Sequence, residues 1–427
     1  MDAVLLLIAF FVFVGIGAPI AYAMGMAALF GAFWIGIPYE AVMIKISDGI
    51  SKFSLLAIPF FVLAGAIMAE GGMARRLVSF ANVLVGFVRG GLALVNIVAS
   101  TFFAGISGSS VADTSAIGSV LIPQMVRAGY PRLFAVNVTI SGSLQALLIP
   151  PSHNMVLYSL AAGGSISVGA LFLAGVVPGL LLGASLMLYV LFISYKNGYP
   201  KGEAIPLRQA IGIAGDALWG LGTMVIILGG ILSGVFTATE SAAVACIYSF
   251  LVTMFIYRDY KWSVLPLLLH RVVKTVAMVM MLIAFASAFG YIVALMQLPA
   301  RATNFFLTLS DNKYVILMMI NLLLLVLGCL MDMAPLILIC TPILLPVIKT
   351  LGVDPVHFGI MLIVNLGIGL LTPPVGSVLF VGCAVGKVTI EQVTRTIWPF
   401  YIVMFIVLML VTYVPAISLT MPKFFGM

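Results

Sequence analysis

A run of small and hydroxyl residues, from Gly105 to Gly118, interrupts a long apolar part of the chain. It carries the hydroxyls of Ser107, Ser109 and Ser110 and one carboxylate, Asp113. Hydrocarbon cannot solvate such a run, so at membrane depth it must lie inside protein or along a wet cavity. An acid within a membrane segment indicates a functional site. Hydroxyl, carbonyl and carboxylate oxygens are the ligands that hard cations prefer.

The composition identifies the surroundings of this run as a membrane protein. Of the 427 residues, 63% are hydrophobic and 8% are charged, whereas soluble domains contain about 25% charged residues. One spanning helix needs roughly 20 apolar residues, so about ten spans fit. The net charge of +7 does not predict nucleic-acid binding, because the cations form short clusters between apolar spans, as topology signals do. The start of the chain lacks the basic region of a cleavable signal peptide, and we expect none.

The polar run divides residues 91–127 into two short apolar arms. Each arm is too short to cross a hydrocarbon core of ~30 Å comfortably. The segment can therefore be a re-entrant hairpin, or one long helix that carries a polar patch. The Ser-Gly-Ser-Ser sequence at the tip favours the hairpin, because these residues are poor in a helix interior.

A second interruption follows, where Pro150-Pro151 breaks the span predicted over 133–162. Proline has no N–H and disfavours helical geometry in the residue before it. The carbonyls from Ala146 to Ile149 therefore lose helical partners. Freed carbonyls inside a membrane are candidate cation ligands.

Both interruptions recur in the second half of the chain. Landmarks of the first half reappear 223 positions later: Pro123 as Pro346, Gly129 as Gly352, and Pro150-Pro151 as Pro373-Pro374. Interrupted segments at matching positions of two halves are the best sequence indication of a transporter site.

The repeat predicts an all-α polytopic membrane protein in which each half has five transmembrane helices and one re-entrant hairpin. The first repeat, 1–210, comprises scaffold helices over 1–76, an interfacial arm helix over 77–90, hairpin one over 91–127, the broken span over 133–162 and a span over 168–194. The second repeat, 211–427, comprises scaffold helices over 211–296, an arm helix over 299–313, hairpin two over 314–349, the broken span over 357–385 and a last span over 397–417.

Five crossings are an odd number, so the two halves are expected to be inverted. With both termini outside, most of the 20 Lys and Arg residues fall in inside loops, as the positive-inside rule requires. Hairpin one then enters from the cytoplasm and hairpin two from outside, and both tips can reach the middle of the membrane.

We expect two quasi-symmetric cation sites with substrate between them. The candidate ligands are, in the first half, Ser107, Ser109 and the carbonyls of Ala146, Ile149 and Pro151, and in the second half Gly328, Asp332, Gly369, Thr372 and Pro374. The alternative is that the small residues serve close helix packing. That alternative explains Asp113 and Asp332 poorly, because a buried acid at mid-membrane costs roughly 2.5–3.5 kcal/mol.

Polar residues beside the first site are candidates for binding an organic acid. They are Ser110, Asp113, Ser152, His153 and Asn154. His153 can instead be a satisfied structural residue, and Asp113 can contact substrate, shape the hairpin or tune the field at the ion. Thr239-Glu240 is interpreted as a helix cap with an acid in the first turn.

Nucleotide and catalytic motifs are not found in the sequence. The segment Gly382 to Lys387 resembles a phosphate loop but has three residues between its glycines, and Val388 follows the lysine. The driving force is therefore expected to be an ion gradient, or ATP hydrolysed by another subunit.

Four motifs together resemble the large membrane subunit of tripartite ATP-independent periplasmic (TRAP) transporters, over essentially the whole chain. They are Gly105-Ile-Ser-Gly-Ser-Ser-Val-Ala-Asp113, Leu148-Ile-Pro-Pro-Ser152, Phe236-Thr-Ala-Thr-Glu240 and Leu371-Thr-Pro-Pro-Val-Gly376. The resemblance implies uptake of an organic acid driven by sodium, with about two sodium sites, elevator-type movement and no nucleotide. It also implies a periplasmic substrate-binding protein, a separate small four-helix membrane subunit, and a bacterial inner (cytoplasmic) membrane with both termini periplasmic.

The family's sodium ligands would fall on the hairpin-tip serines and on the carbonyls before each Pro-Pro. Some members have glycine where this chain has Ala146, but a backbone carbonyl is still present there. The His153-Asn154 pair looks more like sialic-acid members than C4-dicarboxylate members. Alternatives are a proton-coupled carrier that uses Asp113 and Asp332, an ion channel built on the same hairpins, and an intramembrane enzyme, for which no nucleophile–base pair is found.

Overall fold

The computed structural model describes residues 2–259 and 261–427, with side chains described from residue 4 onward. The α-helices of the first half are α1 (Asp2–Gly15), α2 (Ile20–Ile35), α3 (Tyr39–Ile50), α4 (Ala57–Glu70), α5 (Met73–Val85), α6 (Gly91–Ser107), α7 (Ser110–Arg127), α8 (Arg132–Gly142), α9 (Gln145–Leu148), α10 (His153–Ala161) and α11 (Val168–Lys196). Those of the second half are α12 (Leu207–Leu232), α13 (Ala238–Leu251), α14 (Leu265–Leu295), α15 (Leu298–Leu309), α16 (Lys313–Leu330), α17 (Met333–Thr350), α18 (Pro355–Gly369), α19 (Ser377–Gly386), α20 (Ile390–Thr396), α21 (Trp398–Tyr413) and α22 (Ala416–Phe424). A short π-helix, η2 (Val252–Tyr257), extends α13.

The length and apolar character of these helices confirm the prediction of an all-α polytopic membrane protein. Within the two described ranges, 7 helices are long and apolar enough to cross a membrane, or up to 10 if each bent pair counts as one span. The bent pairs include the first broken span, where α8–α9 and α10 meet at 49°.

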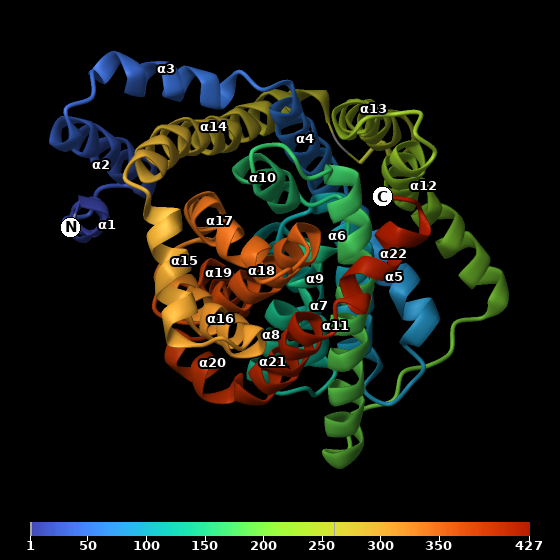
Figure 1. The fold of residues 1–427 in the computed structure, drawn as a ribbon. Helices are drawn as coiled ribbons and strands as arrows, with labels where there is room; N and C mark the ends of the chain where they lie inside the picture. The colour runs from blue at the N-terminus through green and yellow to red at the C-terminus, as the bar shows by residue number, and fades with distance from the viewer. Residues whose placement is uncertain (1, 260) are drawn as a thin grey trace.

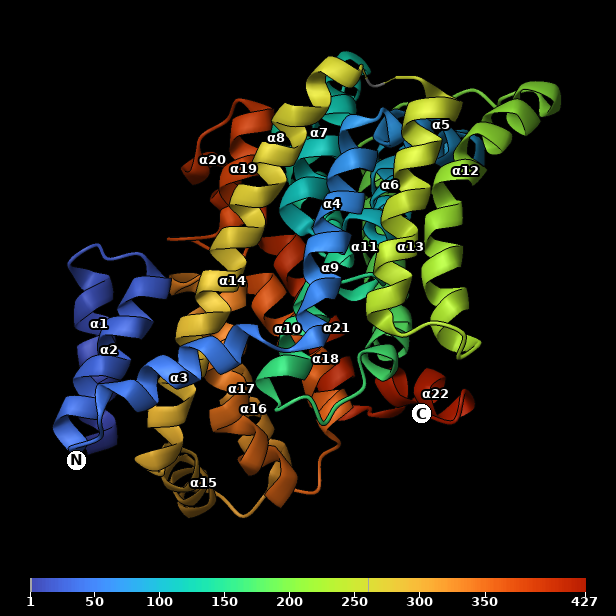
Figure 2. The ribbon, with the colours of Figure 1, turned by 90° about the horizontal axis from the view of Figure 1, so that it is seen from above.

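Helices from both halves form an outer belt, which we define as α1–α4 together with α12–α14. Within it α14 packs against α2, α3 and α4, while α13 lies between α4 and α12. Figures 1 and 2 show α1 and α2 at one end of this belt and α12 and α13 at the other. The belt surrounds one side of a central group of shorter helices.

The central group is built from the two hairpins and the two broken spans. Helices α6 and α7 are the arms of hairpin one, and α8, α9 and α10 are the pieces of the first broken span; α16 and α17 form hairpin two, and α18 and α19 the second broken span. The halves interlock, because α7 packs against α19 and α10 packs against α17. Figure 1 shows α7, α9, α18 and α19 gathered near the centre of the molecule.

Local sequence signals explain where the central helices begin. The Ser109 hydroxyl accepts from the Ala112 N–H at 3.4 Å and caps α7. The Asp354 carboxylate accepts from the Val356 N–H at 2.7 Å and caps α18, whose first residue is Pro355. These caps fix where the second arm of hairpin one and the second broken span begin.

The structure differs from the expected layout at several boundaries. Within the region expected to hold scaffold helices, the polar residues 39–50 form the helix α3, which packs against α14. The arm helix expected over 77–90 is α5, which begins after Gly72 at φ 72° and ends at Val85. The arms of both hairpins are longer than expected, at 17 and 18 residues in hairpin one and 18 residues each in hairpin two. A helix of 18 residues is about 27 Å long. The re-entrant course of the hairpins and the inversion of the halves stay predictions.

Candidate ion and substrate site

The tip of hairpin one lies directly against the break of the first broken span. Gly108 adopts φ +59°, and a Cβ there would collide with the carbonyl oxygen of Pro151. On the same side, Ala146 and Ile149 pack with Ala104 of α6 in one small cluster. The structure therefore brings the predicted carbonyl ligands of the first half next to the serine-bearing tip.

The tip serines are arranged by hydrogen bonds within the hairpin. The Ser107 hydroxyl accepts from the Ser109 N–H at 3.4 Å, and both side chains are half-buried. Ser110 is buried, and its hydroxyl lies 2.8 Å from that of Ser143 in the first broken span. A hydroxyl that accepts one hydrogen bond keeps a further lone pair, so Ser107 and Ser109 still have oxygen lone pairs available to an ion.

The tip of hairpin two meets the second break in the same way. A Cβ on Gly369 would lie 2.7 Å from the Cα of Gly328. The Val375 N–H donates to the carbonyl of Cys329 at 3.2 Å, which ties the hairpin to the segment after Pro373-Pro374. The predicted residues Gly328 and Gly369 are thus in backbone contact.

The carbonyl groups at the two breaks differ in their hydrogen bonding. Ala146 and Leu147 precede Pro150 and Pro151 by four positions, and proline offers no N–H to their carbonyls. At the second break the carbonyl of Gly369 accepts from the Thr372 N–H at 2.9 Å. Since a carbonyl oxygen has two lone pairs, it can still bind a cation.

Thr372 and Pro374 complete the set expected at the second break. The Thr372 carbonyl accepts from the Gly376 N–H at 3.2 Å, and its hydroxyl donates to the Ile368 carbonyl at 2.9 Å. Thr372 is half-buried and Pro374 is exposed, so this break is more open than the first.

The two predicted acids have opposite environments. Asp113 is fully buried, as expected, and neither of its carboxylate oxygens has a hydrogen-bond partner among the described residues. Asp332 was expected to be buried, and that expectation is wrong, because its side chain is exposed. It stands between the arms of hairpin two as the residue before α17, where its carboxylate accepts from the Ser377 hydroxyl at 3.2 Å.

Residues after the first Pro-Pro lie close to both tips. A Cβ built on Gly108 would lie 3.3 Å from the Cα of Ser152, and the half-buried His153 follows as the first residue of α10. Ser152 and Asn154 are buried, and the Ser152 hydroxyl has no hydrogen-bond partner within the described ranges. The packing of α10 against α17 brings these candidate substrate-binding residues beside hairpin two.

Sequence reasoning missed a pair of buried amide contacts that join each hairpin to its own broken span. In the first half, the Asn96 amide donates to the Thr139 hydroxyl at 2.7 Å. In the second, the Asn365 amide donates to the Asn321 side-chain oxygen at 2.8 Å. The sequence contained a signal for these contacts, namely asparagines within apolar spans. A buried amide has no water to bind, so it needs a hydrogen-bond partner in the protein.

The helix-cap interpretation of Glu240 is confirmed, although its partner was misplaced. The cap is Thr237, whose N–H donates to the Glu240 carboxylate at 2.8 Å and whose hydroxyl accepts from the Glu240 N–H. Thr239, which was expected to be the cap, lies inside the helix. Glu240 therefore completes a capping box at the start of α13.

A cavity of about 230 Å³ separates the belt from hairpin two and the end of the first broken span. Its wall includes Lys52 and Ser287 from the belt, Leu160 and Gly163 from α10 and the turn after it, and Pro342 from α17. The cavity thus lies between the elements expected to stay fixed and those that carry the candidate site.

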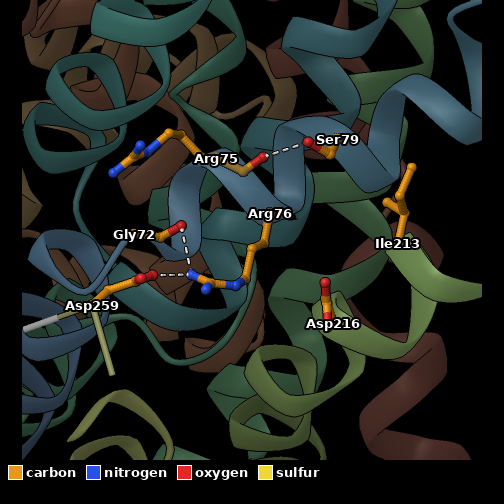
Figure 3. Close-up of a pocket in the computed structure, with 7 residues that line it drawn as sticks. All are labelled: Gly72, Arg75, Arg76, Ser79, Ile213, Asp216 and Asp259. Carbon is orange, nitrogen blue, oxygen red and sulfur yellow. Dashed lines mark hydrogen bonds and ion pairs between the residues drawn. The ribbon is translucent and has the colours of Figure 1, made fainter. Parts of the chain in front are cut away.

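A larger, polar cavity of about 290 Å³ lies away from the hairpins and breaks, against the start of α5 (Figure 3). Arg76 forms an ion pair with Asp259 there, and its guanidinium lies 3.8 Å from the ring centre of Tyr257. The Tyr257 hydroxyl donates to the Asp216 carbonyl. These contacts attach the first turn of α5 to the belt, and we assign the cavity no part in the ion site.

Comparison with known proteins places this architecture in one family. Residues 7–417 match the family model described as "Tripartite ATP-independent periplasmic transporter, DctM component". A C4-dicarboxylate TRAP transporter large permease protein of Pseudomonas aeruginosa is 44% identical over 91% of this chain and 90% of its own length. A sialic acid TRAP transporter large permease protein of Vibrio cholerae is 41% identical over 96% of both chains.

A solved structure shares the fold at low sequence identity. The YdaH transporter of Alcanivorax borkumensis, described as having an unusual topology, superposes with a TM-score of 0.61 at 14% identity and covers 88% of both chains. At this identity the likeness concerns the fold alone.

Proposed function

Because the chain belongs to the DctM component family of tripartite ATP-independent periplasmic (TRAP) transporters, as a large membrane permease, we propose that it imports an organic acid driven by sodium. Two sodium ions would bind at the two contacts between a hairpin tip and a Pro-Pro break. The substrate would bind between them, beside Ser110, Asp113, Ser152, His153 and Asn154.

The observation that carries the proposal is the double contact of tip and break. Gly108 abuts the Pro151 carbonyl, and Gly328 abuts Gly369. Ser107 and Ser109 would add hairpin-tip oxygens to the carbonyls at the first contact, and Asp332, four residues after Gly328, would do so at the second. Such oxygen-only sets suit a hard cation, and unwound backbone near the membrane midplane is where secondary transporters bind their coupling ions.

The cavity between the belt and hairpin two lies outside this substrate site and would be a route by which an anionic substrate approaches it. Lys52 is an exposed cation in its wall, and Ser287 adds a hydroxyl. Relatives named for C4-dicarboxylate and for sialic acid are 44% and 41% identical, so overall identity does not separate the two. We favour a sialic acid or similar acidic sugar because of His153-Asn154, with a C4-dicarboxylate next.

The arrangement also supports an elevator movement. The belt would be the fixed scaffold, and the hairpins and broken spans would move as one body, since they interlock across the halves. α5 and α15 would be the arms that join the two parts. The chain would lie in a bacterial inner membrane with both termini periplasmic, pair with a small four-helix subunit, and receive substrate from a periplasmic binding protein.

Uptake into proteoliposomes that contain both membrane subunits and the binding protein tests the coupling ion. We expect saturable uptake with a sodium gradient and none with a proton gradient of equal size. Ser107→Ala with Ser109→Ala should raise the sodium concentration for half-maximal uptake by about tenfold, since a lost hydrogen bond to a charged group costs about 1.5 kcal/mol or more.

Ser119→Ala is the matched control, because Ser119 lies on the exposed side of α7 and only donates to the Ala116 carbonyl. Its sodium curve should equal that of the wild type. An unchanged curve in the double variant would place the first ion elsewhere.

A proton-coupled carrier is the second candidate, and the buried, unpartnered carboxylate of Asp113 favours it. Uptake driven by the proton gradient alone, and abolished by Asp113→Asn, would establish this alternative. Unitary currents in the absence of the binding protein would instead indicate a channel.

A further inference from the structure

An apolar cavity of about 510 Å³ lies between α1 of the belt, the arm helix α15 and both arms of hairpin two. Its wall includes Phe10 from α1, Phe305 from α15, Leu327 from α16 and Ile343 from α17. The helix α15 packs against α17, and Figure 2 shows α1 on the opposite side of α14 from the hairpin-one elements. The cavity thus separates a belt helix from a hairpin that we expect to move.

One charged side chain breaks the apolar wall. Of the residues that line the cavity, Arg301 alone carries a charge. It is exposed in the first turn of α15, and within the described ranges no carboxylate forms an ion pair with it. Long basic side chains near a membrane interface lay their stems along apolar surface and hold the charged group in the polar layer.

The chemistry of the wall decides what kind of molecule fits. Water does not fill apolar cavities of this kind, because it lacks polar partners there. A small organic acid would gain one charge partner but leave the remaining wall uncovered. The rim of the cavity carries the exposed side chains of Val4, Phe11 and Phe305, so it opens where the protein meets lipid.

We propose that this cavity binds a membrane phospholipid, with an acyl chain in the apolar space and the phosphate paired with Arg301. A guanidinium can donate two parallel hydrogen bonds to a phosphate, and the volume falls within the ~300–1,000 Å³ that ligand pockets occupy. The lipid would fill the gap between α1 and hairpin two and keep both surfaces covered when they move past one another.

Native mass spectrometry of the purified, delipidated full chain tests the site. The probes are phosphatidylglycerol, phosphatidylethanolamine and diacylglycerol, which has chains but no phosphate. The wild type should bind one molecule of either phospholipid more tightly than any further copy. Arg301→Gln should weaken the affinity of that first step about tenfold for both phospholipids. It should leave the affinity for diacylglycerol unchanged. Arg301→Lys should weaken phospholipid binding less than Arg301→Gln does.

Two further variants separate a built site from general lipid association. Ala302→Trp fills the cavity and should remove the tight first binding step for both phospholipids. Arg208→Gln alters another exposed first-turn arginine, in α12, and should bind like the wild type. The proposal would be overturned if Arg301→Gln and Arg208→Gln lost the same phospholipid affinity. It would also be overturned if the tight first step survived in Ala302→Trp.

Discussion

Gly328 and Gly369 touch through their backbones, so that a Cβ on Gly369 would lie 2.7 Å from the Cα of Gly328. The contact joins the tip of hairpin two to the residue four places before Pro373. It leaves no room for a side chain on Gly369, and a Cβ on Gly328 would lie 3.2 Å from the Cα of Gly369. The backbone oxygens proposed to bind the second ion are therefore held in place by the absence of side chains.

Gly369→Ala should disturb this contact and the ion site together. We expect a loss of about 1–3 kcal/mol in stability, the usual cost of overpacking, and a higher sodium requirement for uptake. Thermal unfolding in detergent and sodium-dependent uptake measure the two effects. Gly229→Ala is the control, because a Cβ there meets nothing within 4 Å. Equal behaviour of the two variants would contradict the role of the contact.

Gly108→Ala tests the contact at hairpin one. Alanine at φ +59° is strained, and its Cβ would collide with the Pro151 carbonyl. Gly129 has φ +93° but open space around it, so Gly129→Ala carries the backbone strain without the collision. Uptake should fall much further in Gly108→Ala than in Gly129→Ala. If the two variants lose the same activity, strain alone accounts for the effect and the contact is not needed.

Asp332→Asn should impair transport more than Glu240→Gln does. The amide keeps the size of Asp332 and can still accept from Ser377, but it removes the charge proposed for the second ion. We expect the sodium requirement to rise about tenfold. Glutamine at position 240 preserves the capping box with Thr237, so uptake should stay near that of the wild type. If Glu240→Gln impaired uptake more than Asp332→Asn, the second ion site would not include Asp332.

The buried amide pair of the second half should contribute to folding rather than to ion binding. Asn321→Ala removes an acceptor of the Asn365 amide and should cost about 1–3 kcal/mol, because a buried donor loses a partner. Replacing both residues by leucine should recover much of that loss. Thermal unfolding measures stability, and the sodium curve of the surviving protein should be unchanged. A shifted sodium curve would give these amides a part in the site.

The sequence predicted those features that depend on local chemistry. Pro150-Pro151 and Pro373-Pro374 break their helices because proline lacks an N–H, and α9 and α18 end just before them. The Ser-Gly-Ser-Ser sequence interrupts hairpin one as expected, since α6 ends at Ser107 and Gly108 follows with φ 59°. These effects act over a few residues, so composition and spacing were enough to locate them.

Features that depend on distant packing were not predicted. Asp332 is exposed although its sequence neighbours are apolar, because the side chain projects between two helix arms toward Ser377. The contact between Asn321 and Asn365 crosses 44 positions, and nothing local to either residue names its partner. The pairing of α7 with α19, and of α10 with α17, also arises only when both halves are folded together.

The packing of α7 on α19 and of α17 on α10 makes the two halves of the chain resemble the partners of a domain-swapped dimer, here joined by a linker. Each half contributes the second arm of its hairpin to the broken span of the other. Folding one half alone would leave α7 or α17 without the surface that it covers. Assembly of the central group therefore requires both ends of the synthesised chain, and the linker between α11 and α12 fixes their ratio at one to one.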